Sequence, residues 1–73
     1  MNEPVKSALR LYGEYLDGRQ QHLDKTVIDA IRTIRAYAYE RDPDNEHIQK
    51  AIVTAKTRKL TGAQLEALIS EMK

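Results

Sequence analysis

The sequence predicts an all-α fold, a compact bundle of four short and mostly antiparallel helices. Apolar residues recur at helical spacing in four separate segments, and no segment alternates as a strand does. Turn and capping residues divide these segments at short intervals. Short connections favour antiparallel neighbours in a helical bundle. The alternative arrangement is three helices with a packed C-terminal helical arm.

The first helix is predicted to open at Pro4, which suits a first helical position, with Asn2 or Glu3 as its cap. Gly18 is expected to end this helix in the left-handed conformation. Gly13 is expected to lie on the polar side of the helix. The apolar stripe of the helix comprises Val5, Leu9, Tyr12 and Leu16, widened by Ala8 and Tyr15.

The second helix is predicted to start at Asp24 or Thr26 and to carry a wide apolar arc. A wide arc indicates packing against more than one neighbour, so this helix is expected to be the central element, with Ile31 and Ile34 fully buried. The arc comprises Val27, Ile31, Ile34 and Ala38, flanked by Ile28, Ala30 and Tyr37.

The third helix is predicted to follow the turn around Pro43, where acidic residues suit the positive end of a helix dipole. It is expected to continue as far as Lys59. Its narrow stripe contains small residues that permit close helix approach: Ile48, Ala51, Ile52 and Ala55.

The fourth helix is predicted to start at Thr61, because Gln64 three residues later completes a capping-box pattern. The helix presents a narrow apolar seam. This seam comprises Leu65, Leu68, Ile69 and Met72.

The chain has 73 residues and is interpreted as a single domain spanning 1–73. A chain of this length buries only roughly 60% of its unfolded surface, so its core is small. The absence of cysteine excludes disulfides, thiolate zinc sites and cysteine nucleophiles. Self-association, most simply as a homodimer, would add buried surface, and a dimer is therefore expected.

No apolar run approaches the ~20 residues that a membrane-spanning helix needs, so no membrane span is expected. The N-terminal residues show no basic segment followed by an apolar one. A cytoplasmic location is the resulting expectation.

Catalytic chemistry is not expected from this sequence. His22 and His47 have no second ligand at metal-binding spacing, and the three glycines are isolated rather than grouped in a phosphate loop. Ser7 and Ser70 lack a glycine elbow or a neighbouring base. The protein is therefore predicted not to be an enzyme and to use no cofactor and no metal.

Charge is unevenly distributed, although the whole chain has a formal net charge of only +1. No carboxylate occurs from 47 through 65. Basic residues in the last turn of a helix are favourable to its dipole without any partner. The functional interpretation is an anion site, in which free amides at the start of the fourth helix and nearby cations receive a phosphate or carboxylate. The residues of this basic corner are Lys56, Arg58, Lys59 and Gly62.

Arg32 and Tyr39 are expected on the outside of the second helix, opposite its apolar arc. Tyrosine and arginine are frequent hot-spot residues at protein interfaces. This pair is therefore a second candidate site, an interface for a partner protein.

The leading functional expectation is a non-enzymatic protein-binding module: a regulator, an adaptor, or an inhibitor of the immunity-protein kind that occupies a partner's surface. It follows by elimination of catalytic chemistry. One alternative is a nucleic-acid-associated accessory protein that contacts phosphates through the basic corner. A further alternative is a self-assembling structural subunit.

Overall fold

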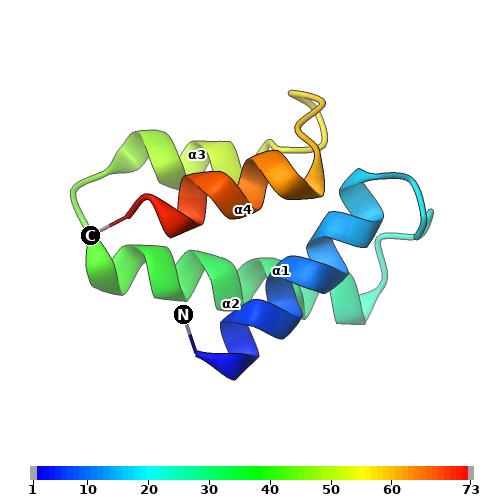
Figure 1. Cartoon of the computed structure of the whole chain (residues 1–73), viewed down its shortest axis with the longest axis horizontal. Helices are drawn as coiled ribbons and strands as arrows, with labels where there is room; N and C mark the ends of the chain where they lie inside the picture. The colour runs from blue at the N-terminus through cyan, green and yellow to red at the C-terminus, as the bar shows by residue number, and fades with distance from the viewer. Residues whose placement is uncertain (1, 73) are drawn as a thin grey trace.

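The computed structural model describes residues 2–72, and this part of the chain is all-helical, without a strand. The predicted all-α bundle of four helices is confirmed. In Figure 1, α2, α3 and α4 run along the long axis of the molecule in alternating directions, while α1 crosses them obliquely. None of the helices in 2–72 has the length and apolar character needed to cross a bilayer. The helices are α1 (Glu3–Leu16), α2 (Lys25–Arg41), α3 (Glu46–Val53) and α4 (Gly62–Ser70).

α1 lies against both α2 and α4, and α2 also lies against α3. The prediction that the second helix packs against more than one neighbour is therefore confirmed. The Cα radius of gyration is 11.0 Å, close to the ~11 Å expected for a folded domain of this length.

Each helix begins at a side chain that caps it. In all four cases the capping oxygen accepts a hydrogen bond from the backbone N–H three residues later, which satisfies an amide that has no partner inside the helix. Thr61 and Gln64 form the full capping box predicted for α4. The caps are Asn2, Asp24, Asn45 and Thr61.

The core is aliphatic except for Tyr12, which is 1% exposed. The Tyr12 hydroxyl donates a hydrogen bond of 2.6 Å to the carbonyl of Ile52, which joins α1 to α3. Burial, together with the smaller effect of the neighbouring Tyr15, raises the pKa of Tyr12 to about 12. The other core side chains are Val5, Ala8, Leu9, Val27, Ala30, Ile34, Ala38, Ile48, Ala51, Ile52, Ala55, Leu65 and Ile69.

The apolar arc of α2 is narrower than predicted. Ile34 is fully buried, but Ile31 is only half-buried and Ile28 is 37% exposed. The prediction that Ile31 is fully buried is wrong. The physical reason is that α1 and α3 cover two sides of α2 and leave its third side to solvent.

The third helix ends at Val53, and the prediction that it continues to Lys59 is wrong. The backbone N–H and the hydroxyl of Thr54 both donate to the carbonyl of Lys50, at 3.0 and 2.5 Å. A threonine hydroxyl that competes for a helical carbonyl weakens regular helix at that point. The chain continues through 54–59 as a series of turns.

Candidate functional site

The basic corner is built by a left-handed turn between α3 and α4. Lys59 has a φ of 61°, and its N–H donates to the carbonyl of Lys56 at 3.1 Å. The N–H of Leu60 donates to the carbonyl of Ala55 at 2.9 Å. These two bonds form a Schellman motif, in which the left-handed position is usually a glycine. Lys59 therefore has a conformational role in the turn, whatever else its charge does.

Lys56 of the basic corner contacts the end of α1. Its Nζ donates to the carbonyl oxygen of Tyr15 at 2.9 Å and lies 4.7 Å from the centre of the Tyr15 ring. The last turn of α1 contains no basic residue of its own. Lys56 supplies the cation that the carbonyl end of this helix favours.

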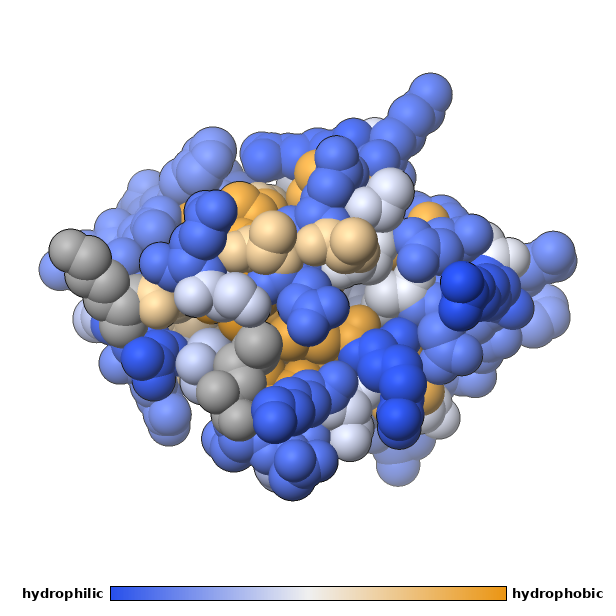
Figure 2. All heavy atoms as spheres, viewed as in Figure 1, coloured by the Kyte–Doolittle hydropathy of each residue, from blue (hydrophilic) through white to orange (hydrophobic). Residues whose placement is uncertain are grey.

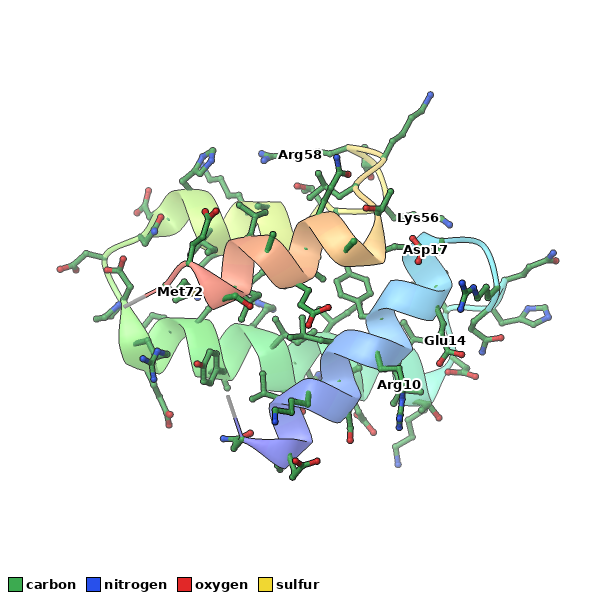
Figure 3. All side chains as sticks on the ribbon, viewed as in Figure 1. Arg10, Glu14, Asp17, Lys56, Arg58 and Met72 are labelled. Atoms are coloured by element: carbon green, nitrogen blue, oxygen red, sulfur yellow. The ribbon has the colours of Figure 1, made fainter. Side chains whose placement is uncertain are left out.

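The expected free amide at Gly62 is not free, and this part of the anion-site prediction is corrected. The N–H of Gly62 donates to Oδ1 of Asp17 at 2.8 Å. The first turn of α4 has no acidic residue, so Asp17 also supplies the negative charge that this helix end favours. Figure 3 shows Asp17 and Lys56 at the same corner of the molecule, where the end of α1 meets the start of α4.

Gly13 is buried at the crossing of α1 and α4, so its predicted place on the polar side of the first helix is wrong. A Cβ atom built on Gly62 would lie 2.8 Å from the Cα of Gly13. The two helices therefore approach each other closely only because both positions lack a side chain. Here the name α1–α4 junction denotes the contact formed by Gly13, Tyr15, Asp17, Lys56 and Gly62.

Arg58 and Lys59 remain exposed at the basic corner. Arg58 lies away from the α1–α4 junction, on the outer side of the turn segment (Figure 3). The corner thus presents Arg58 and Lys59 together with Lys56, whose ammonium group is exposed but bound to the Tyr15 carbonyl, and it presents no free amide at Gly62. The sequence did contain a sign that Lys56 and Asp17 bind these helix ends. The last turn of α1 has no basic residue and the first turn of α4 has no acidic residue, so each helix end lacks a favourable charge of its own.

The second predicted site lies where it was expected. Arg32 and Tyr39 are both exposed on α2, and Tyr39, at 61%, is the most exposed of the large hydrophobic side chains described. Residues seven apart lie on the same face of a helix, two turns from each other. The outer face of α2 is defined as the exposed residues Ile28, Asp29, Arg32, Ala36 and Tyr39.

The charged side chains on this face have no internal partners. Within residues 2–72 the ion pair is between Lys6 and Glu3, far along the chain from α2. Asp29 and Arg32 make no side-chain hydrogen bond or ion pair in the described part of the chain. The outer face of α2 therefore presents polar groups that the fold itself does not use.

A side-chain hydrogen bond joins α2 to α3. The side-chain amide of Gln49 donates to the backbone carbonyl of Arg35 at 3.3 Å, which ties the two helices along this edge. Val53, one turn beyond Gln49, is 46% exposed.

An open groove of about 620 Å³ lies between α3 and α4, and sequence reasoning missed it. Its apolar walls come from Ile48 and Leu68 on the two helices, and Arg41 and His47 lie at its rim. Helices from separate parts of the sequence line the groove, so no local pattern indicates it. Figure 2 shows apolar patches on one face of the molecule, surrounded by hydrophilic residues.

Neither histidine lies in a metal-binding cluster. His22 is exposed in the segment before α2, and His47 is exposed at the rim of the groove. In the described residues, no three side chains of His, Asp or Glu are grouped so that they could hold a metal ion.

No protein-family model, curated protein or solved structure matches this chain. The chemistry of the protein's own surfaces is therefore what indicates its function.

Proposed function

We propose that this protein is a non-enzymatic protein-binding module, a small regulator, adaptor or inhibitor that docks on a partner through the outer face of α2. The observation that carries the proposal is the exposure of Tyr39 and Arg32 on one helix face, where Asp29 and Arg32 have no internal partners. Tyrosine and arginine are typical residues of interface hot spots.

The opposite side of α2 makes the helix a rigid platform. Ile34 and Ala38 are fully buried in the core, and α1 and α3 pack on either side of the helix. A binding surface carried on a packed helix holds its side chains in place before the partner arrives, which reduces the entropy lost on binding.

Protein binding is proposed ahead of nucleic-acid binding because of the state of the basic corner. Lys56 binds the carbonyl of Tyr15, and the Gly62 amide binds the carboxylate of Asp17. Arg58 and Lys59, even with the exposed charge of Lys56, would release few phosphate counterions, and affinity for nucleic acid grows with the number of phosphates neutralised.

The test is affinity capture with the purified, tagged protein, followed by mass spectrometry of the captured proteins. The double variant Arg32→Ala/Tyr39→Ala should lose specific partners, because both side chains are exposed and the fold does not need them. The matched control is Arg58→Ala/Lys59→Ala, which removes two exposed side chains from the basic corner and should retain the same partners.

Circular dichroism would show that both double variants remain helical. Capture that survives Arg32→Ala/Tyr39→Ala but disappears in the Arg58→Ala/Lys59→Ala control would refute the proposal. If nuclease treatment then also removed the captured material, the basic corner would be the functional surface and nucleic acid its ligand.

A further inference from the structure

We propose that Asp17 is a site of covalent modification, where the peptide linkage to Gly18 isomerises slowly to an isoaspartyl linkage. The α1–α4 junction holds Asp17 in a conformation that does not react, so the modification occurs when the junction opens. Once formed, the isoaspartate removes the carboxylate from the start of α4 and prevents the junction from closing again. The modification therefore weakens the fold of each molecule in which it has occurred.

The reaction needs only this chain and water. The backbone nitrogen of Gly18 attacks the side-chain carboxyl carbon of Asp17, and the carboxyl hydroxyl leaves with the amide proton as one molecule of water. The product is a five-membered cyclic imide. One molecule of water then opens the imide. Opening at the backbone carbonyl leaves the chain linked through the side chain, as isoaspartate, and opening at the other carbonyl restores aspartate.

Asp17 is the residue at which the sequence favours this attack. In the whole sequence it is the one aspartate or asparagine that precedes a glycine. Glycine has no Cβ to shield its amide nitrogen. Asp17 and Gly18 are both exposed, and a Cβ atom built on Gly18 would meet no other atom within 4 Å. No neighbouring part of the fold therefore crowds this linkage.

The backbone conformation of Asp17 blocks the attack in the folded protein. Ring closure needs the Cβ of Asp17 and the nitrogen of Gly18 to be nearly eclipsed about the Cα–C bond. Asp17 has a ψ of 1°, so the Gly18 nitrogen is instead eclipsed with the nitrogen of Asp17, about 120° away from Cβ at a tetrahedral Cα. A rotation of that size would break the 3.2 Å hydrogen bond from the N–H of Gly18 to the carbonyl of Tyr15.

The α1–α4 junction also holds the side chain of Asp17, which lies at the corner where α1 meets α4 (Figure 3). Its Oδ1 accepts the 2.8 Å hydrogen bond from the N–H of Gly62. The N–H of Asp17 donates to the carbonyl of Gly13, also at 2.8 Å. The residue is thus fixed through both its backbone and its carboxylate. Attack requires a local opening of the junction, and such openings are less costly than global unfolding.

The isoaspartyl product does not fit the junction. Its Cβ belongs to the main chain, which becomes one atom longer, and its free carboxylate is attached directly to Cα. The geometry that placed Oδ1 at the N–H of Gly62 is therefore lost. Since the first turn of α4 contains no acidic residue, this helix end would then have neither its hydrogen-bond acceptor nor a negative charge nearby.

The test is incubation of the purified full chain for several weeks in mildly acidic buffer made with water that contains heavy oxygen. Tryptic digestion then releases the peptide 11–19, which contains Asp17. Its isoaspartyl form should appear in mass spectrometry as a separate chromatographic peak that carries one heavy oxygen. Isoaspartate should form at least about tenfold faster in unfolding concentrations of urea than in the folded protein.

A variant and an internal control separate the junction from the sequence. Gly62→Ala, whose Cβ forces α1 and α4 apart, should accelerate the modification of the folded protein roughly tenfold. The control is Asp24, an exposed cap like Asp17, which precedes a residue with a side chain, Lys25. Asp24 should remain aspartate in the same samples. The purified isoaspartyl protein should unfold at a lower urea concentration than the original protein.

Four results would overturn the inference. They are no isoaspartate at Asp17 even in urea, equal rates in the folded and unfolded protein, an unchanged rate in folded Gly62→Ala, and an unchanged urea midpoint of the isoaspartyl protein. If circular dichroism shows that Gly62→Ala does not fold, the original protein in urea below its midpoint replaces it. The rate should already rise there, because the junction opens before the core. A rate that rises only in proportion to the unfolded fraction would exclude the junction as the gate.

Discussion

The α1–α4 junction and the outer face of α2 contain the same kinds of residue in opposite situations. In the junction, Lys56 binds the carbonyl end of α1, and Asp17 binds the amide end of α4. On the outer face of α2, the side chains of Asp29 and Arg32 have no partner within residues 2–72. One region uses its charges and aromatic ring to hold the fold together, and the other exposes them.

The difference teaches that a concentration of charge does not by itself mark a binding site. The basic corner was the more conspicuous feature of the sequence, yet half of its residues complete helix ends. The outer face of α2 is inconspicuous in sequence, because Arg32 and Tyr39 are separated by ordinary helix. What distinguishes it is the 61% exposed ring of Tyr39 on a helix face that carries Arg32 and Asp29, and matched substitutions in the two regions can measure this contrast.

The largest effect is expected inside α2, on the side opposite its outer face. Ile34→Ala should reduce the free energy of unfolding by roughly 2–5 kcal/mol, because it leaves a cavity at a fully buried position. Ile28→Ala on the outer face should cost less than about 1 kcal/mol, and the half-buried Ile31→Ala should fall between the two. Urea unfolding monitored by circular dichroism measures all three. Equal losses for Ile34→Ala and Ile28→Ala would mean that α2 has no free face.

The next effect concerns the close approach in the junction. Gly62→Ala should reduce stability by roughly 1–3 kcal/mol, because its Cβ would meet the backbone of Gly13 at 2.8 Å and force α1 and α4 apart. Ala63→Gly, at an exposed position next to it, serves as the control and should lower stability by no more than about 1 kcal/mol through helix propensity. The two thermal midpoints give the comparison. A Gly62→Ala protein as stable as the original would show that the helices do not need this contact.

A third contrast compares the buried Tyr12 with the exposed Tyr39. Tyr12→Phe should cost roughly 1–3 kcal/mol, because it leaves the buried carbonyl of Ile52 without its partner. Tyr39→Phe on the outer face should leave the stability of the monomer unchanged. Both values come from urea unfolding in dilute solution, where association is absent. Comparable losses at the two positions would contradict the different roles assigned to these hydroxyls.

The raised pKa of Tyr12 also predicts that the stability of the protein depends on pH. Its pKa is raised by burial from 10.0 to about 12 in the folded protein. The stability that this raised pKa represents is fully present below pH 10 and is lost as the pH rises toward 12, because the unfolded chain releases the proton first. Stability curves between pH 9 and 12 should therefore fall more steeply for the original protein than for Tyr12→Phe. If the stability of the two proteins fell equally with pH, Tyr12 would not be the cause of the decrease.

The smallest expected effect is an increase in stability. Lys59→Gly should stabilise the protein by up to about 1 kcal/mol, because glycine adopts the left-handed conformation of this Schellman position at lower cost than lysine. Gly18→Ala, at the equivalent left-handed position after α1, where φ is 82°, should destabilise by a similar amount. Differential scanning calorimetry would measure the increase in stability of Lys59→Gly and the decrease in stability of Gly18→Ala. A loss of stability with Lys59→Gly would indicate that the lysine side chain itself contributes to the turn.

The sequence by itself determined the helices and where they begin. The caps at Asp24 and Thr61 and the left-handed stop at Gly18 are local features, so a few neighbouring residues suffice to predict them. The core-facing stripes of α1 and α4 followed from helical spacing in the same way, although Leu16, Leu68 and Met72 are only partly buried. The outward position of Tyr39 followed too, because it depends only on the angle between residues of a single helix.

Only the tertiary structure decided how those helices use their polar residues and glycines. Asp17 caps a helix that starts 45 positions later, and Lys56 binds a carbonyl 41 positions before it. Gly13 is buried only because α4 crosses α1 at that point, and Ile28 is exposed only because no helix covers the third side of α2. Such contacts depend on the distance and angle between helices far apart in the chain. Side-chain packing sets these quantities, and periodicity along one segment contains no information about them.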